Sequence, residues 1–503
     1  MKTSNIRDLT RPTGLINQLR VQAETLRATK EAVDLGRHRF GPPRIVVREH
    51  ANNAVRWKVG ERLNHLIETT CIRFADRIAI VVGETTLSYR DLNRRANQMA
   101  RHLIQQGIRS GDRVGLILDK SFEAYIAMLA VLKVNAAYVP LDAAFPVERI
   151  NFIVGDAEMS AIVTMSGFAE HLAASSIKKI FLDTDRLVID TQPAEPLTEV
   201  EAPAEPLAYI VYTSGTTGHP KGVGIGHASI CNFVRVAAEL YGYQATDRVY
   251  QGMTIAFDFS IEEIWVPMMA GATLVPAKPG ATLLGEELGQ FLQECGVTVM
   301  ACCPTLLSTI EQELPKLRIL LVGGEACPQN LVKRWYRPGR RILNSYGPTE
   351  ATVTATLTEL TPDKPVTIGI PLATYSIVIL DPHEDKTVAP GELGEIGIAG
   401  VGLALGYMNR DELTMKKFIR DFLNIQNNPS GRIYRTGDLG RIDENGEIDY
   451  RGRIDTQVKI RAAIASSCRR SKLFYLACPR SRRLPSRRSS RTRVSSKSSL
   501  TTR

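Results

Sequence analysis

Beyond the first sixty residues, apolar and polar positions follow a regular pattern along the chain. Residues 87–100 (LSYRDLNRRANQMA) predict the end of a strand and then a helix, because Leu92, Ala96 and Met99 recur at helical spacing and share one face. The apolar run at 114–118 (VGLIL) has the length of a buried strand. These neighbouring patterns predict that helices and strands follow one another closely.

The alternation continues further along the chain. Residues 121–135 predict a helix, which is followed by the apolar segment AAYVPLD, and the run LAYIV at 207–211 is again strand-like. Such strand–helix alternation indicates an α/β fold with a parallel sheet. Between residues 240 and 450 strands are expected to dominate, with turn-rich hairpins such as DENGE at 443–447.

The chain divides into regions of different composition. Residues 1–60 form a polar, arginine-rich N-terminal extension in which a helix is expected around 15–34. A regular core follows at 61–451, and the Pro- and Glu-rich residues 191–206 form a connector inside it. A length of 503 residues suggests roughly three lobes.

Composition limits the classes of protein to which the chain can belong. An apolar content of 44% suits a globular core, and no apolar run reaches the ~18 residues of a membrane span. The charged N-terminal segment is unlike a signal peptide. The eight cysteines form no C-x-x-C pair, which favours free thiols in a reducing cytoplasm over a zinc knuckle or a disulfide framework.

The basic character of the chain is confined to its last part. Residues 462–503 contain ten Arg and two Lys but neither Asp nor Glu. Without these twelve cations, the formal net charge of +10 becomes −2 for residues 1–461, so the body is not expected to bind nucleic acid. The segment lacks apolar periodicity and is predicted to be a disordered basic tail.

The segment 212–223 (YTSGTTGHPKGV) combines hydroxyls, glycines and one lysine directly after a strand-like run. Glycines let the main chain approach an anion, and successive N–H groups form an anion-binding concavity. The segment is not a Walker A motif. It is predicted to hold a polyphosphate, with a flexible surface loop as the alternative. The residues assigned to this phosphate site are Thr213, Ser214, Gly215, Thr216, Thr217, Gly218 and Lys221.

The same segment resembles the signature of the adenylate-forming enzymes, which include acyl-CoA synthetases, luciferases and the adenylation domains of nonribosomal peptide synthetases. Further strings resemble the ordered core motifs of those adenylation domains, and six motifs in order are far more specific than one. The resemblance implies the large, multi-lobed N-terminal domain of this enzyme type. The further strings are LKVNAAYVPLD (132–142), NSYGPTE (344–350), GELGEIGIAGVGLALGY (391–407), YRTGDLGR (434–441) and the hinge motif GRIDTQVKIR (452–461).

The resemblance implies a reaction in which a carboxylate oxygen attacks the α-phosphorus of ATP and pyrophosphate leaves. Charge then builds on phosphoryl oxygens, where cations and oriented donors contribute most to catalysis. Lys221, Thr349 and Glu350 are the implied catalytic residues, with Thr349 donating to the α-phosphate. A carboxylate beside phosphates needs a metal, so Glu350 is the implied ligand of Mg²⁺. The alternatives are a solvated acid for Glu350 and a solvent-facing lysine for Lys221.

Three further residues are implied to bind the nucleoside part of ATP. Tyr346 would stack on the adenine, Asp438 would accept both ribose hydroxyls, and Arg453 would approach the ribose or a phosphate. For Asp438 the alternative is again a solvated loop acid.

The string FDFSIEE at 257–263 indicates the substrate class, again by resemblance. Amino-acid-activating relatives have an Asp at the position of Asp258, where it binds the α-ammonium, and acyl-CoA and aryl-acid enzymes generally lack it. Glu262 is an acid in an otherwise small or apolar pocket, where an unpaired charge is costly. It would pair with the side chain of lysine, ornithine or diaminobutyrate; alternatively, it faces solvent or a neighbouring Arg. The implied pocket residues are Asp258, Phe259, Glu262, Ala301, Leu321, Gly323, Ser345, Val353 and Thr354.

The family pattern stops after Arg461. Relatives continue Gly-Tyr-Arg-Ile-Glu-Leu into a C-terminal lobe, whose lysine bridges the substrate carboxylate and the α-phosphate. Codons for residues 462–471 can be chosen so that reading from the third base gives Gly-Tyr-Arg-Ile-Glu-Leu-Ser-Glu-Ile. A shifted reading frame is the favoured interpretation, and the lobe is expected to be missing. The alternative is a genuine basic tail that binds acidic partners.

The sequence thus predicts an ATP-dependent ligase that forms an aminoacyl-AMP for nonribosomal peptide synthesis, with ATP and Mg²⁺ as cofactors and with impaired activity. In the intact family a phosphopantetheinyl carrier protein is the partner. One rival function is an acyl-CoA or aryl-acid ligase, against which Asp258 argues. The other is an inactive nucleotide-binding remnant.

Overall fold

The computed structural model describes residues 45–48, 54–173, 175–197, 207–214, 219–277, 283–426 and 428–454. Several sequence-based predictions lie outside these residues. They are the helix around 15–34, the second half of the connector 191–206, the glycine-rich centre of the phosphate segment (215–218), most of the hinge motif (455–461) and the tail at 462–503.

A seven-stranded sheet contains the first strands predicted from the apolar pattern. Its inner strands are parallel, as expected for strand–helix alternation, whereas β8 runs antiparallel to both of its neighbours. In spatial order the strands are β18 (Gly406–Tyr407), β8 (Lys221–Gly226), β7 (Leu207–Thr213), β4 (Ala137–Leu141), β3 (Arg113–Ile117), β5 (Ala161–Thr164) and β6 (Lys178–Phe181).

A nine-stranded sheet forms the second layer of the molecule. Its central strands are parallel, and both of its edges end in antiparallel pairs. In spatial order they are β15 (Ile370–Pro371), β14 (Thr356–Glu359), β13 (Arg341–Tyr346), β12 (Ile319–Gly323), β11 (Val299–Cys302), β9 (Arg248–Gln251), β10 (Thr273–Pro276), β1 (Ile78–Val82) and β2 (Thr85–Ser88).

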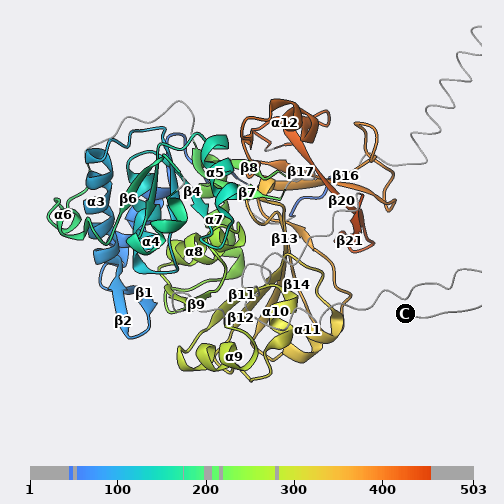
Figure 1. Ribbon diagram of the computed structural model, residues 1–503. Coiled ribbons are helices and arrows are strands. Elements are labelled where there is room, and N and C mark those ends of the chain that lie inside the picture. The colour runs from blue at the N-terminus through green and yellow to red at the C-terminus, as the bar shows by residue number, and fades with distance from the viewer. Residues whose placement is uncertain are drawn as a thin grey trace, which may run out of the picture.

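A smaller antiparallel sheet lies at the upper right of Figure 1. Its last two strands form the hairpin predicted at 443–447. Residues 45–48 belong to the predicted N-terminal extension, yet Val46 pairs with Ile377 of this sheet. The strands are β16 (Tyr375–Leu380), β17 (Gly394–Gly400), β20 (Arg432–Ile442), β19 (Phe418–Arg420) and β21 (Ile448–Arg453).

Helices pack against the two large sheets and against one another (Figure 1). The predicted helix near residue 90 begins at Tyr89, where Ser88 caps it by accepting from the Asp91 N–H, and it buries Leu92, Ala96 and Met99. The α-helices are α2 (Leu63–Arg73), α3 (Tyr89–Gln105), α4 (Phe122–Lys133), α5 (Val147–Asp156), α6 (Arg186–Asp190), α7 (His227–Tyr241), α8 (Phe259–Ala270), α9 (Gly285–Glu294), α10 (Pro304–Thr309), α11 (Gln329–Trp335) and α12 (Asp411–Lys417). The 3₁₀ helices are η1 (Ser166–Phe168), η2 (Glu170–Leu172) and η3 (Thr349–Ala351).

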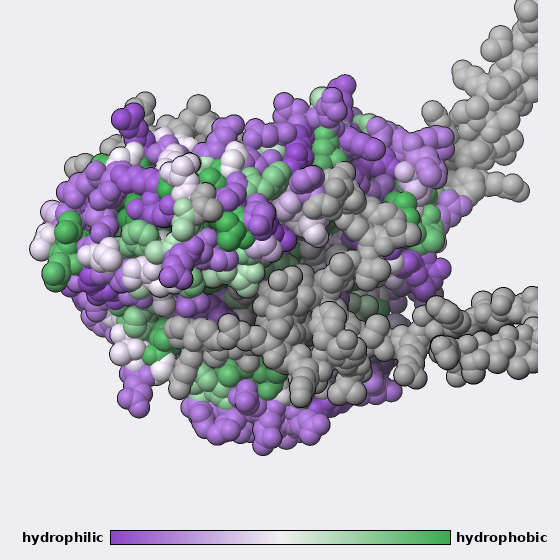
Figure 2. All heavy atoms as spheres, viewed as in Figure 1, coloured by the Kyte–Doolittle hydropathy of each residue, from purple (hydrophilic) through white to green (hydrophobic). Residues whose placement is uncertain are grey.

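The visible surface is largely polar, with apolar residues in scattered patches (Figure 2). Ile72, Leu187 and Met415 are examples of exposed apolar side chains, and they lie on three different helices. Within the described part of the chain, none of the helices has the length and apolar character needed to cross a membrane.

Candidate active site

A cavity of about 280 Å³ opens where strands of all three sheets come together. Thr213, Gly323 and Ser345 lie at or next to the carboxyl ends of β7, β12 and β13, and Asp438 comes from β20. Ligands of α/β sheets characteristically bind at such strand ends. The lining consists of Thr213, Ser214, Lys221, Met253, Phe257, Asp258, Phe259, Cys303, Gly323, Gly324, Glu325, Ser345, Gly347, Pro348, Thr349, Glu350, Val353, Thr354, Tyr434, Thr436, Asp438 and Arg453.

The Lys221 ammonium, from the start of β8, pairs with the Glu350 carboxylate. Nζ lies 2.7 Å from Glu350 Oε1 and 4.5 Å from the centre of the Tyr407 ring. Tyr407 Oη donates to the same carboxylate oxygen over 2.6 Å. Burial opposes ionisation of Glu350, but Lys221 and Tyr407 outweigh it and hold the pKa of this carboxyl below its ordinary value. A buried anion and a cation are thus fixed side by side in the cavity wall.

The Asp438 carboxylate, on β20, has a different partner at each oxygen. Tyr346 Oη donates to Oδ2 over 2.6 Å, and Arg453 Nη1 lies 2.9 Å from Oδ1. The Asp438 side chain is 2% exposed, and its backbone N–H donates to Thr436 Oγ1 over 3.0 Å. These contacts fix the carboxylate as an oriented acceptor at the cavity wall.

Asp258 directly precedes α8, at its N-terminal cap position, and its side chain receives a hydrogen bond from the Thr349 hydroxyl. Both side chains are buried, and both line the cavity. The segment after the β13 strand and the start of the α8 helix are therefore joined at one acidic position, which a ligand ammonium can approach.

The loop after β13 brings Val353 and Thr354 into the cavity wall. Thr352 and Val353 have φ angles of 56° and 69°, which L-residues rarely adopt. Gly347 passes so close to this loop that a Cβ there would lie 2.5 Å from the Val353 carbonyl oxygen and 2.8 Å from the Ala355 nitrogen. Glycine at 347 is therefore what allows the two segments to touch.

Glu262 lies behind the cavity wall and is fully buried. Tyr241 donates to Oε1, and Thr354 Oγ1 donates to Oε2 over 3.3 Å. Burial raises the pKa of Glu262 to about 8, against the hydrogen bonds from Tyr241 and Thr354. The alternative expectation of solvent or an Arg partner is wrong: among the described residues no cation forms an ion pair with Glu262.

Most of the residues predicted from sequence lie in the cavity lining, but four do not. Glu262, Ala301, Leu321 and Tyr346 lie behind the lining. Leu321 precedes Gly323 by two positions on β12, so it shares the same face but lies deeper along the strand. Gly215, Thr216, Thr217 and Gly218 are outside the described residues. The predicted residues in the lining are Thr213, Ser214, Lys221, Asp258, Phe259, Gly323, Ser345, Thr349, Glu350, Val353, Thr354, Asp438 and Arg453.

Two features of the cavity bear on anions and metals. The Thr213 hydroxyl is inaccessible to solvent and has no hydrogen-bond partner within the described residues, as expected of a donor that awaits a ligand. In the same part of the chain, no three acidic, His or Cys side chains cluster as a metal site. Glu350 is a single buried carboxylate, which fits Mg²⁺ because that ion takes most of its ligands from phosphates and water.

Sequence reasoning named Tyr346 but missed Tyr407 and Tyr434. Tyr407 fixes Lys221 and Glu350, and its ring packs edge-on against Phe418, which also contacts Tyr434. Tyr407 ends the string GELGEIGIAGVGLALGY, and Tyr434 begins YRTGDLGR. The signal was therefore present in the motifs, but nothing in their spacing says that the two ends meet.

Comparisons with known sequences show the family of the chain. The sequence model of the family described as AMP-binding enzyme matches residues 67–408. One of the subunits of linear gramicidin synthase from Brevibacillus parabrevis is 43% identical over 394 residues, which are 77% of this chain and 5% of that protein. Delta-poly-L-ornithine synthetase of Acinetobacter baumannii (strain AB307-0294) is 40% identical over 408 residues, 80% of this chain and 30% of that protein. The chain thus spans less than a third of the length of either relative.

Solved structures share the fold. The nonribosomal peptide synthetase FmoA3 in its α-methyl-L-serine-AMP bound form has a TM-score of 0.72 and 30% identity, covering 80% of this chain and 46% of that one. The N-terminal subdomain of Klebsiella oxytoca NpsA, in complex with 3-hydroxybenzoyl-AMSN, has a TM-score of 0.69 and 26% identity, covering 78% and 97%. The described residues therefore correspond to almost the whole of that N-terminal subdomain.

Proposed function

The chain belongs to the AMP-binding enzyme family, and we propose that it activates an amino acid by converting it with ATP into an aminoacyl-AMP. The observation that carries the proposal is the Asp258–Thr349 hydrogen bond. It places an acceptor for an α-ammonium and a donor for a phosphate in direct contact within one cavity. A ligase for fatty or aryl acids has no use for a buried carboxylate at this point.

The same contact couples the two substrates. The Thr349 hydroxyl donates to Asp258. When the α-ammonium of an amino acid occupies Asp258, the threonine hydroxyl is released to donate to the α-phosphate. The carboxylate oxygen of the amino acid then attacks the α-phosphorus, the bond to the bridging oxygen breaks, and pyrophosphate leaves with that electron pair. Charge develops on phosphoryl oxygens, where preorganised donors and cations act most strongly.

Lys221 and the phosphate segment serve the leaving pyrophosphate. The Lys221 ammonium is held by Glu350 and the face of Tyr407, so a polyphosphate meets a cation that is already oriented. The Thr213 hydroxyl offers a further donor. Glu350 is the residue that would hold Mg²⁺, which supplies positive charge across the phosphates.

Asp438, Arg453 and Tyr346 serve the nucleoside. The two oxygens of Asp438 accept from Tyr346 and Arg453, and ribose hydroxyls would take the place of one or both donors. Since the Tyr346 ring lies behind the lining, it supports the adenine site through Asp438 and through its contact with the Tyr450 ring, whose centre is 6.1 Å away.

We further propose that the preferred amino acid carries a second cation, as in lysine, ornithine or diaminobutyrate. Thr354 lines the cavity, and its hydroxyl donates to Glu262. The Glu262 carboxyl therefore lies directly behind Thr354 in the cavity wall. A buried carboxyl that has no cationic partner among the described residues gains most from a cationic ligand. The name of the Acinetobacter relative, a delta-poly-L-ornithine synthetase, favours the same class. A phosphopantetheinyl carrier protein is the proposed acceptor of the product.

ATP–pyrophosphate exchange with a panel of carboxylic acids tests the function. Exchange should depend on amino acids and should be highest with diamino acids. Neutral isosteres such as norvaline separate the amino-acid requirement from the side-chain requirement. Exchange that responds to benzoates or fatty acids and to no amino acid would contradict the activity proposed for Asp258.

A further inference from the structure

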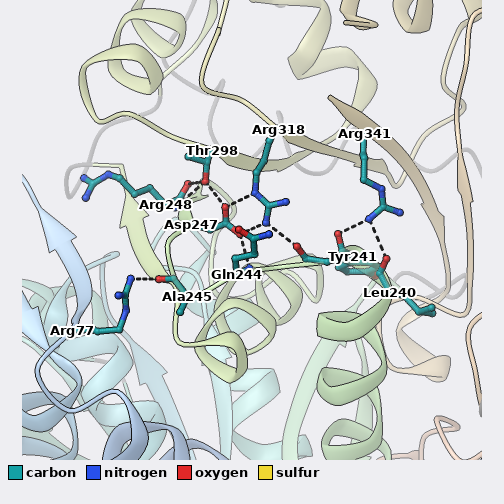
Figure 3. A network of polar contacts seen from close by, with 11 residues as sticks. Arg77, Leu240, Tyr241, Gln244, Ala245, Asp247, Arg248, Thr298, Arg318 and Arg341 are labelled. Atoms are coloured by element: carbon teal, nitrogen blue, oxygen red, sulfur yellow. Dashed lines mark hydrogen bonds and ion pairs between the residues drawn. The ribbon is translucent and has the colours of Figure 1, made fainter. Parts of the chain in front are cut away.

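Tyr241, the last residue of α7, is held by its backbone as well as by its ring (Figure 3). Its carbonyl oxygen accepts from Arg341 Nη1 over 2.8 Å. The carbonyl of Gly242 accepts from Arg318 Nη2 over 2.8 Å, and Gly242 ends the helix with a φ of 73°. Guanidinium groups at a helix C-terminus satisfy carbonyls that have no partner inside the helix and favour the helix dipole.

Both arginines are themselves anchored. Arg318 Nε lies 2.7 Å from Asp247 Oδ1, and the same oxygen accepts from Thr298 Oγ1 over 2.8 Å. Arg341 Nε lies 3.0 Å from Glu359 Oε2. The end of α7 is therefore bonded to arginines at the start of two strands of the nine-stranded sheet, as the network in Figure 3 shows.

The same two strands also reach the cavity. Arg318 directly precedes β12 and Arg341 begins β13, whereas the opposite ends of these strands supply Gly323 and Ser345 to the cavity lining. Tyr241 is thus bonded to the start of a strand that reaches the cavity, although Tyr241 itself does not line the cavity. Its buried hydroxyl donates to Glu262, which in turn accepts from Thr354 of the lining.

We infer that Tyr241 is a positioning residue for side-chain recognition: its hydroxyl fixes the Glu262 carboxyl against Thr354 and stabilises it in the ionised form that a substrate cation requires. The inference deepens the proposed function and rests on it for the substrate class. Tyr241 touches no substrate; it acts through Glu262.

The surroundings of Glu262 explain why the Tyr241 hydroxyl has a large effect on the ionisation of this carboxyl. Among the described residues, the acids Asp258 and Glu263 of the α8 segment raise the pKa of this carboxyl further, and the phenols Tyr243 and Tyr375 lie within range of its charge. All of them are neutral or negative, so they disfavour the carboxylate or leave it unaided. The hydrogen bonds from Tyr241 and Thr354 are the contacts that favour the charged form.

Infrared titration of the Glu262 carboxyl in the substrate-free full chain tests this role directly, with Glu262→Gln identifying the band. Tyr241→Phe removes the donor and keeps the ring, so the titration midpoint should rise by about one pH unit. The matched control is Tyr243→Phe, since that ring lies 5.7 Å from the Tyr241 ring but donates no described hydrogen bond to Glu262. It should leave the midpoint in place.

Arg341→Gln provides a second variant that keeps the tyrosine. If the guanidinium acts through Tyr241, Arg341→Gln should raise the midpoint in the wild-type background and have no effect in the Tyr241→Phe background. The same midpoint in wild type and Tyr241→Phe would overturn the inference.

Calorimetry with ornithine and norvaline, in the presence of a non-hydrolysable ATP analogue, separates the positioning role of Tyr241 from the proposed preference for a diamino acid. The preference for ornithine should fall about tenfold in Tyr241→Phe, with unchanged affinity for the nucleotide. A shifted midpoint in a protein that never distinguishes ornithine from norvaline would support the positioning role of Tyr241 and refute the proposed diamino acid substrate. An intact ornithine preference in Tyr241→Phe would overturn the positioning role alone.

Discussion

The Lys221 ammonium lies 2.7 Å from the Glu350 carboxylate, although 129 residues separate the two along the chain. Asp258 and Thr349 form an equivalent contact, as do Asp438 and Arg453. Each of these charged or polar groups is therefore satisfied by another group of the cavity. In the proposed reaction, substrate binding would exchange these internal partners for external ones, which would keep the groups oriented without leaving them buried and unpaired.

The Lys221–Glu350 pair should behave as a unit. Lys221→Met leaves a buried carboxylate with Tyr407 as its remaining strong partner and should lower the free energy of unfolding by about 1–3 kcal/mol. The double variant Lys221→Met/Glu350→Gln should recover part of that loss. Urea denaturation measures both, and equal losses in the single and the double variant would show that the pair is not coupled.

Nucleotide binding should depend on Asp438. Asp438→Ala removes the acceptor of Tyr346 and Arg453, and we expect affinity for ATP to fall at least about tenfold by calorimetry. Glu444→Ala, in the exposed turn of the same hairpin, is the control and should bind ATP as the wild type does. An unchanged affinity in Asp438→Ala would refute the ribose assignment.

Two substitutions should separate recognition of the amino-acid class from recognition of the side chain. Asp258→Ala should lower pyrophosphate exchange with every amino acid, because the α-ammonium loses its acceptor. Glu262→Gln should mainly reduce the preference for a diamino acid over its neutral isostere, by roughly ten- to a hundredfold. A chain that prefers leucine or phenylalanine to ornithine, lysine and diaminobutyrate would exclude the role of Glu262 while leaving that of Asp258 intact.

Glu262 should also make stability depend on pH. Its pKa of about 8 in the folded chain lies above the ordinary value of 4.5, so its contribution is fully present below pH 4.5 and is lost as the pH rises through 8. The free energy of unfolding, compared with Glu262→Gln, should fall by up to about 1.4 kcal/mol per pH unit across this window. Parallel curves for the two proteins would mean that Glu262 is already ionised near pH 4.5.

Gly347 should tolerate no side chain. A Cβ there meets backbone atoms of Val353 and Ala355, so Gly347→Ala should cost about 1–3 kcal/mol of stability and weaken amino-acid binding. Gly155→Ala is the matched control, because that site in α5 has open space and a helical environment. It should be neutral or stabilise the chain by up to about 1 kcal/mol. Equal thermal unfolding of both variants would contradict the close approach at Gly347.

Local signals in the sequence predicted much of the fold. The helical spacing of Leu92, Ala96 and Met99 specified the buried face of α3, and DENGE specified the β20–β21 hairpin. In both cases the determining residues are neighbours in the chain. The parallel direction of the inner strands of the seven-stranded sheet was predicted from strand–helix alternation, whereas the antiparallel β8 was not.

The partners inside the site could not be predicted in this way. Glu262 was expected to line the pocket, with solvent or an Arg as the alternative, yet it lies behind the lining and meets Tyr241 of another helix and Thr354 of a distant loop. Tyr407 meets Glu350 across 57 residues. Such pairs depend on how separate sheets pack together, and the hydrophobic periodicity of the sequence contains no information about that packing. The resemblance of the motifs to those of adenylation domains indicated which residues share a cavity, but not which residue each of them touches.

The attachment of Tyr241 to β12 and β13 has a consequence for engineering. Attempts to change the preferred amino acid by exchanging cavity-lining residues between related domains would transfer Thr354 and its neighbours but leave the tyrosine of α7 behind. A glutamate grafted at position 262 would then pack against the helix end of the recipient domain, where the hydroxyl of Tyr241 is not guaranteed. The pocket would have the shape of the donor pocket, but its carboxyl would lose the hydrogen bond that favours the ionised form. If Tyr241 positions Glu262 as inferred, the segment to transfer is the pocket of this chain together with the C-terminus of α7 and the two arginines that hold it.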